Sequence, residues 1–182
     1  EIMNELGYNA MTIGNHEFDY SVENLKELKD YAQFPFLSCD FYELSNNELI
    51  FEPYTIIEAD GLKIAIIGIT TPDTITSSTP TFFTDENNRF IYSFSSGPEE
   101  LWMQVQKTVD EVNKKGADIV IAASHLGSVE GYQYCCTDMI ENTLGIDVVL
   151  DGHSHSVIEG NTVKNKDGEN VLLASTGEKL NN

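Results

Sequence analysis

The protein has 182 residues, enough for one domain with a sizeable buried core. Hydrophobic residues make up 41% of the chain, which excludes a disordered protein, and no apolar run approaches the roughly 20 residues that a membrane-spanning helix needs. The formal net charge of -20 argues against a nucleic-acid partner, because such a surface repels phosphate backbones. A small phosphorylated substrate would be repelled too, unless bound divalent cations reversed the local field.

Short apolar strands alternate with amphipathic helices along the chain. In chain order the pattern predicts a helix over 2–6, a strand over 9–13, a helix over 22–32, strands over 34–38, 54–58 and 63–70, a helix over 98–115, a strand over 117–123, a helix over 132–144, and strands over 146–150, 161–165 and 171–175. Asp60-Gly61 and Asp167-Gly168 predict hairpin turns. Residues 71–98 are rich in Thr, Ser, Pro and Asn and predict a long loop with a short strand near 90–94. The mixture predicts a layered α/β fold.

All four histidines lie just past the end of a predicted strand, in turns that contain Gly or Ser. Ligands collect at the carboxyl ends of strands in α/β sheets, so this placement predicts a shared site. His153 and His155 are two residues apart, which points both rings the same way on an extended segment, and Gly152 allows a sharp turn before them. A lone histidine such as His125 is more often structural, but beside the other three it becomes a candidate metal ligand.

His16 lies in the segment Gly14-Asn15-His16-Glu17-Phe18-Asp19. Asn15 offers a neutral amide oxygen, and Asp19 is close enough to hydrogen-bond the imidazole of His16 if a helical turn begins there. A carboxylate behind an imidazole fixes its tautomer and favours its cationic form. A cationic imidazole would stabilise the charge of a phosphoryl transition state. The alternative is a helix start at which Asp19 interacts with the helix dipole.

Three blocks of the sequence resemble signature blocks of the calcineurin-like metallophosphoesterases. They are G-N-H-E at 14–17, S-H-L-G at 124–127 and G-H-S-H at 152–155. The extension E-F-D at 17–19 and the segment 63–73 are similar to the branch that contains 5'-nucleotidases, UDP-sugar hydrolases and 2',3'-cyclic-nucleotide phosphodiesterases. The resemblance covers nearly the whole chain and implies a four-layer α/β/β/α sandwich, incomplete at the amino end, with residues 1–182 as a partial catalytic domain.

The resemblance also implies a metal centre with two divalent ions. Asn15, His125 and His153 would bind one ion, and His155 would bind the other. Nitrogen and oxygen ligands of this mixture are compatible with Zn, Mn, Co and Fe alike, so the identity of the metals stays open.

His16 and Asp19 would be the catalytic residues of such a centre, with His16 contacting the phosphoryl group and Asp19 as its partner carboxylate. The implied reaction is the hydrolysis of a phosphate ester, in which a hydroxide that bridges the metals attacks phosphorus. The metals and His16 would neutralise charge on the oxygens of the phosphoryl group.

The sequence departs from the family pattern in two respects. The family has an Asp-x-His block and a Gly-Asp block before the segment 9–13, and neither occurs there in this chain. Without them we expect the 182-residue chain to bind at most one metal well and to have little activity. Nothing in the sequence corresponds to the carboxyl-terminal nucleotide-binding domain of the branch, so the residues that bind the substrate stay unknown.

The sequence therefore predicts an enzyme that acts on a small phosphorylated substrate, first of all a nucleoside 5'-monophosphate. A UDP-sugar or a 2',3'-cyclic nucleotide is the alternative substrate within the same branch. A non-catalytic metal-binding relic is the alternative from another class, although such a relic would not need both His16 and Asp19. The branch is often exported, which predicts a periplasmic, cell-wall or extracellular protein, and the oligomeric state stays open.

Overall fold

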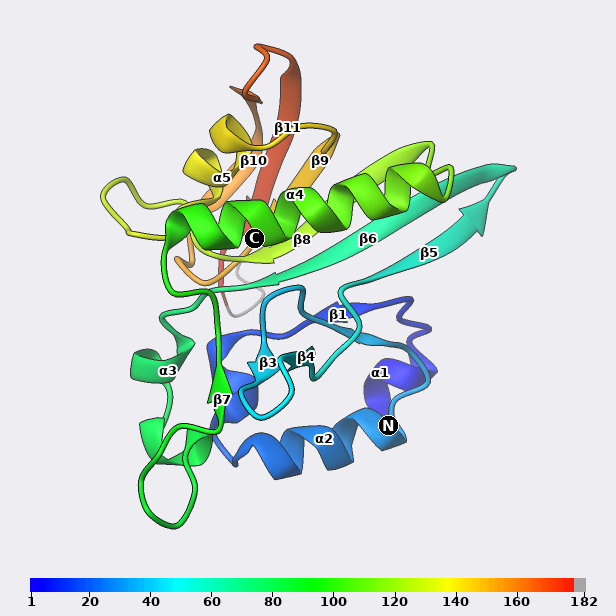
Figure 1. The fold of residues 1–182 in the computed structure, drawn as a ribbon. Helices are drawn as coiled ribbons and strands as arrows, with labels where there is room; N and C mark the ends of the chain where they lie inside the picture. The colour runs from blue at the N-terminus through cyan, green and yellow to red at the C-terminus, as the bar shows by residue number, and fades with distance from the viewer. Residues whose placement is uncertain (179–182) are drawn as a thin grey trace.

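The structure is a computed structural model that describes residues 1–178, so residues 179–182 of the predicted domain lie outside the described part. Its main element is a six-stranded sheet with the strand order β10-β11-β9-β8-β6-β5 (Figure 1). The strands are β5 (Tyr54–Ala59), β6 (Leu62–Thr70), β8 (Ile119–His125), β9 (Val148–Asp151), β10 (Val157–Lys164) and β11 (Asn170–Thr176). Strands β6, β8, β9 and β11 are parallel, and β5 and β10 add antiparallel edges. The carboxyl ends of β8 and β9 therefore meet at one edge of the sheet.

Both predicted hairpins are confirmed, and one strand is longer than predicted. Asp60 and Gly61 turn the chain between β5 and β6 with φ angles of 51° and 82°. Strand β10 begins at Val157 rather than near residue 161, and its pairing with β11 shifts register between Ile158 and Asn161. The shift breaks the alternating pattern, which explains why the sequence predicted only the regular part of the strand.

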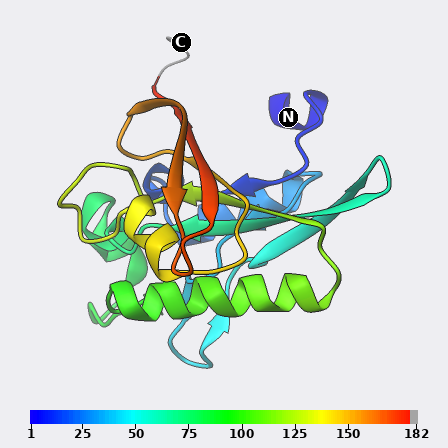
Figure 2. The same ribbon diagram turned by 90° about the horizontal axis from the view of Figure 1, so that it is seen from above.

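Two helices cover one face of the large sheet (Figure 1). They are α4 (Pro98–Lys114) and α5 (Cys136–Asn142). Helix α4 buries the stripe of Leu101, Val105, Val109 and Val112 completely, so its prediction from helical periodicity is confirmed. Figure 2, turned by 90°, shows α4 as the longest helix of the molecule. The helix predicted over 132–144 is shorter than expected: it begins at Cys136, because Cys135 just before it has an extended backbone, with φ of -108° and ψ of 139°.

The opposite face of the large sheet carries a small parallel pair, β1 (Met11–Thr12) and β2 (Phe36–Leu37). The backbones come very close here: a Cβ atom at Gly68 of β6 would lie 2.3 Å from the Cβ of Leu37. The helices α1 (Ile2–Glu5) and α2 (Val22–Tyr31) lie beyond this pair, and Ser21 caps α2 by accepting the N–H of Asn24. The order helix, sheet, sheet, helix is the predicted four-layer α/β/β/α arrangement (Figure 1).

A second core lies among β2, α2 and the neighbouring loop segments, and it is rich in aromatic side chains. Its buried aromatic residues are Phe18, Phe34, Phe36, Phe41, Phe51, Phe83, Tyr92 and Phe94. A three-stranded sheet of β3 (Tyr42–Glu43), β4 (Glu48–Leu49) and β7 (Tyr92–Ser93) borders this core. The predicted loop 71–98 contains β7 as expected, but also the helix α3 (Thr74–Ser77) and the 3-10 turn Pro80–Phe83, which the sequence did not predict.

Candidate metal centre

Three sequence-predicted ligands lie at the carboxyl edge of the parallel strands. His125 is the last residue of β8, and His153 follows the last residue of β9 by two positions. Asn15 opens the 3-10 turn Asn15–Phe18, which follows β1. The carboxylate of Glu17 accepts the backbone N–H of Gly14 at 2.8 Å, which fixes the start of this turn. Three segments that are far apart in the sequence thus meet at one place.

The donor atoms of these three side chains converge. The amide oxygen of Asn15 lies 2.9 Å from Nε2 of His125 and 3.3 Å from Nδ1 of His153. The two imidazole rings are 5.0 Å apart between centroids. Around a tetrahedral ion with bonds of roughly 2.1 Å, neighbouring ligands are about 3.4 Å apart. The three side chains therefore fit one divalent cation with modest adjustment, and their nitrogen and oxygen donors suit Zn, Mn, Co or Fe.

Two glycines make room for the ring of His125. A Cβ atom at Gly14 would lie 2.7 Å from both Cε1 and Nε2 of that ring, far inside van der Waals contact. A Cβ atom at Gly152 would lie 3.4 Å from Nδ1 of the same ring. The two glycines of the sequence blocks at 14–17 and 152–155 thus hold open the space in which His125 faces Asn15.

The electrostatics of the site favour neutral imidazoles. Burial, followed by the neighbouring His153, lowers the pKa of His125 to about 4. Burial likewise lowers the pKa of His153. Neutral imidazoles offer the lone pair that a metal ion needs, and no proton has to leave before binding at neutral pH.

His16 and Asp19 form the predicted pair. Nδ1 of His16 lies 2.9 Å from Oδ2 of Asp19, and the side chain of His16 is 74% exposed. The 3-10 turn brings the carboxylate behind the imidazole, as the spacing of three residues predicted. His16 follows Asn15 directly in the chain, so an exposed imidazole stands beside the converging donors.

His155 is not brought together with the three converging donors. Its Nδ1 lies 3.0 Å from Oε2 of Glu178, near the end of the described chain. Within residues 1–178, the structure contains no group of three or more His, Cys, Asp and Glu side chains that could hold a metal ion. The set of Asn15, His125 and His153 has two such side chains, and its third donor is an amide. The described residues thus supply one set of three donors, and His155 stands apart from it.

Asp151 is a residue of this region whose role the sequence did not indicate. It is the last residue of β9 and is only 9% exposed. Its Oδ1 accepts the hydroxyl of Ser124 at 2.7 Å, and burial raises the pKa of its carboxyl group. A carboxylate that directly follows an apolar strand, one residue before the Gly-His block, was the available signal.

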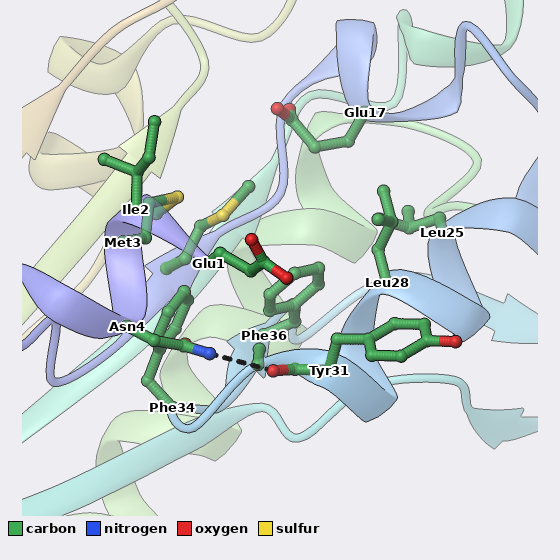
Figure 3. Close-up of a pocket in the computed structure, with 12 residues that line it drawn as sticks. Glu1, Ile2, Met3, Asn4, Glu17, Leu25, Leu28, Tyr31, Phe34 and Phe36 are labelled. Carbon is green, nitrogen blue, oxygen red and sulfur yellow. Dashed lines mark hydrogen bonds between the residues drawn. The ribbon is translucent and has the colours of Figure 1, made fainter.

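The cavities of the molecule differ in their suitability for a phosphorylated ligand. A cavity of about 550 Å³ lies between α1, β1, β2 and α2 (Figure 3). Its lining is mostly apolar, and the carboxylates of Glu1 and Glu17 would repel an anion. A hollow of about 510 Å³ opens beside His153 and is lined by polar residues that include Asp73 and Gln133. The second hollow lies next to His153, and a third, of about 250 Å³, is lined by His125 and Asp151.

The chain matches the family model described as calcineurin-like phosphoesterase over residues 2–157. It is 39% identical to the protein UshA of Salmonella pullorum over 125 residues, which cover 69% of this chain and 21% of that protein. It is 32% identical to a 5'-nucleotidase of Vibrio cholerae over 164 residues, which cover 86% of this chain and 28% of that protein. The chain thus spans about a quarter of the length of these relatives.

A solved structure supports the same relationship. The 5'-nucleotidase precursor of Thermus thermophilus superposes with a TM-score of 0.76 at 28% identity, covering 97% of this chain and 34% of that one. The layered fold, the three sequence blocks and the match of the family model over most of the chain agree with one another. The chain belongs to the family of calcineurin-like phosphoesterases.

Proposed function

We propose that the protein hydrolyses phosphate monoesters, with nucleoside 5'-monophosphates as its substrates. The observation that carries the proposal is the convergence of Asn15, His125 and His153 beside the pair of His16 and Asp19. The relative named 5'-nucleotidase supports the choice of a nucleotide over other phosphate esters. Residues 1–182 would form part of the catalytic domain of such an enzyme.

Asn15, His125 and His153 would hold a divalent cation, which supplies charge that lowers the pKa of a water nucleophile and neutralises phosphoryl oxygens. Bound there, it would also reverse the field of a chain with a net charge of -20. The burial that keeps both imidazoles neutral keeps their lone pairs available at neutral pH.

His16 would contact the phosphoryl group. Its Nδ1 donates to the carboxylate of Asp19, so Nε2 faces away from that carboxylate, and in the cationic form of the imidazole Nε2 would donate a hydrogen bond to a phosphoryl oxygen. The imidazole is exposed, so a substrate can reach it without rearrangement of the core. Asp19 would act as the positioning residue that fixes the tautomer and the orientation of the ring.

His155 would be the first ligand of a second divalent ion. Its Nδ1 faces Glu178, which leaves Nε2 for a metal, as is usual for histidine ligands backed by a carboxylate. The described residues supply one set of three donors, so we propose that the 182-residue chain binds one ion well and turns over slowly.

The part of the chain that the structure describes has no helix long and apolar enough to cross a membrane. Export of the protein, as in the branch it resembles, is a proposal that fractionation of the source cells would test.

The test is an assay for inorganic phosphate with added Mn²⁺ or Zn²⁺. We expect slow, chelator-sensitive release from nucleoside 5'-monophosphates, little from 3'-monophosphates, and a loss of about 10²–10³-fold in His16→Ala. Ion binding measured in His16→Ala is the control, and it should match the wild type. UDP-sugars and 2',3'-cyclic nucleotides assayed in parallel separate the alternatives, and the absence of release from every ester would favour a non-catalytic relic.

A further inference from the structure

A single carboxylate connects the two turns that carry His125 and His153. Asp151 ends β9, and the next two residues are Gly152 and His153. Strand β9 is parallel to β8, with Ala123 opposite Leu150, so the side chain of Asp151 lies beside the end of β8. The carboxylate therefore lies against the turn that carries His125 and precedes His153 by two residues in the chain.

Asp151 accepts hydrogen bonds from residues on both sides of His125 in the sequence. Its Oδ1 accepts the hydroxyl of Ser124 at 2.7 Å and the backbone N–H groups of Leu126 and Gly127, each at 3.3 Å. The donors come from the residue before His125 and from the two residues after it. A carboxylate with such a set of donors holds the side chain of Ser124 on one side of His125 and the backbone of Leu126 and Gly127 on the other, and thereby restricts the direction in which the ring points.

This arrangement has a counterpart at the other end of the same strands. The carboxylate of Asp147, just before β9, accepts the N–H of Val120 in β8 at 2.8 Å. Both aspartates thus tie β9 to β8 through the backbone, but Asp147 lies far along the strands from the histidines. Asp147 therefore serves as a control: a substitution there removes a contact between β9 and β8 and leaves the candidate metal ligands alone, whereas a substitution of Asp151 affects both.

We propose that Asp151 is a positioning residue that holds His125 against Asn15, so that the three donors are in place before an ion binds. Only 9% of Asp151 is exposed, so its contacts are made inside the protein. The inference rests on the proposed metal centre for its functional meaning, but the positioning itself exists in the metal-free protein.

The experiment compares the variants Asp151→Ala, Asp151→Asn, Ser124→Ala and Asp147→Ala of the 182-residue chain. The first readout is the ¹⁵N and ¹H shifts of the imidazoles in the metal-free protein. The second is the Kd for Co²⁺, taken from its visible absorption. In Asp151→Ala we expect the signals of His125 to move while those of His16 stay, and the Kd to rise about 10–100-fold.

The other variants decide whether the effect is one of positioning. Asp151→Asn keeps an acceptor oxygen, so it should restore His125 shifts and a Kd within about threefold of the wild type. Ser124→Ala removes the shortest bond to Asp151, together with the 3.3 Å bond that the Ser124 hydroxyl accepts from the N–H of Leu126. It should move the same signals by less, and it carries the test if Asp151→Ala does not fold. Asp147→Ala should lose stability without moving the shifts of His125 or the Kd.

The proposal is overturned if Asp151→Ala moves the imidazole shifts of His125 no more than Asp147→Ala does. If Asp151→Ala does not fold, Ser124→Ala is compared with Asp147→Ala in its place. A wild-type chain that binds no Co²⁺ would contradict the proposed metal centre instead. In that case the imidazole shifts alone decide whether Asp151 positions His125.

Discussion

The amide oxygen of Asn15 lies 2.9 Å from Nε2 of His125, although 110 residues separate the two in the sequence. Asn15 is 6% exposed, and it opens a 3-10 turn whose start is fixed by Glu17. His125 ends a strand in the centre of the large sheet. The contact joins the large sheet to the turn that follows β1, at the point where the candidate metal ligands gather.

If this contact marks a metal site, removal of the amide should weaken ion binding. We expect the wild-type chain to bind about one divalent ion and Asn15→Ala to bind it at least about tenfold more weakly, because one of three donors is lost. Isothermal titration with Zn²⁺ measures both quantities. Asn9→Ala, which changes an exposed asparagine, is the matched control and should bind as the wild type does. Equal affinity in the two variants would show that Asn15 is not a ligand.

The close approach of Gly14 to the ring of His125 predicts that a larger residue at position 14 lowers stability and weakens ion binding. In Gly14→Ala the new methyl group would lie 2.7 Å from the ring of His125, so the ring must move away from Asn15. Gly14 has a φ of -101°, so backbone strain does not contribute. We expect a loss of roughly 1–3 kcal/mol in the free energy of unfolding from overpacking and weaker ion binding.

Gly97→Ala is the control for this substitution. Nothing lies within 4 Å of a Cβ atom at Gly97, and its φ of -178° is ordinary extended backbone. Chemical denaturation and Zn²⁺ titration should separate the two alanine variants. If Gly14→Ala has the same free energy of unfolding and the same zinc affinity as Gly97→Ala, the ring of His125 does not restrict the space at residue 14.

The packing of the two sheets can be tested at Gly68. A methyl group there would lie 2.3 Å from the Cβ of Leu37 and 2.5 Å from its backbone carbon, and the backbone of β2 cannot move without breaking its pairing with β1. Gly68→Ala should therefore cost more stability than Gly14→Ala, where a side chain has to move. Denaturation midpoints measured side by side give the order, and the reverse order would contradict the described contact between the layers.

The buried carboxyl group of Asp40 predicts a pH dependence of stability. Asp40 is completely buried, and burial raises its pKa from 3.8 to about 8, while its Oδ2 has no hydrogen-bond partner within residues 1–178. Between these two values the folded protein keeps a proton that the unfolded chain releases. The contribution to stability is therefore fully present at low pH and is lost as the pH rises towards 8, by up to about 1.4 kcal/mol per pH unit.

Asp40→Asn removes this titration while keeping the shape of the side chain. We expect the free energy of unfolding of the variant to fall less steeply between pH 5 and about 8, and the variant to be more stable than the wild type at the upper end. Urea denaturation at several pH values measures the two slopes. Parallel profiles of the two proteins would show that Asp40 does not carry a proton in the folded state.

Sequence patterns predicted those parts of the fold whose residues repeat with a clear period. The apolar stripe of α4 is of this kind, and β5 and β6 were indicated instead by the hairpin turn Asp60-Gly61 between them. The two-residue strands β3 and β4 were not predicted, whereas β1, β2 and β7, which are equally short, lie within the predicted segments 9–13, 34–38 and 90–94. The position of β3 and β4 depends on the aromatic core, which forms only when distant segments pack together.

The candidate site shows the same division. The placement of His125 and His153 after strands, and the spacing of His16 and Asp19, were visible in the sequence and agree with the geometry. The pairing of His155 with Glu178 and the contacts of Asp151 with the turn after β8 depend on segments that meet only in the folded chain. No periodicity or spacing within one segment could have indicated them.

The most direct test of the proposed metal centre is a crystal structure of the protein with Zn²⁺, with anomalous diffraction recorded at the zinc absorption edge. The proposal predicts one strong peak at about 2.0–2.2 Å from Oδ1 of Asn15, Nε2 of His125 and Nδ1 of His153. An anomalous map with no zinc peak between these three atoms, or with zinc bound at His16 or His155 alone, would contradict the proposal.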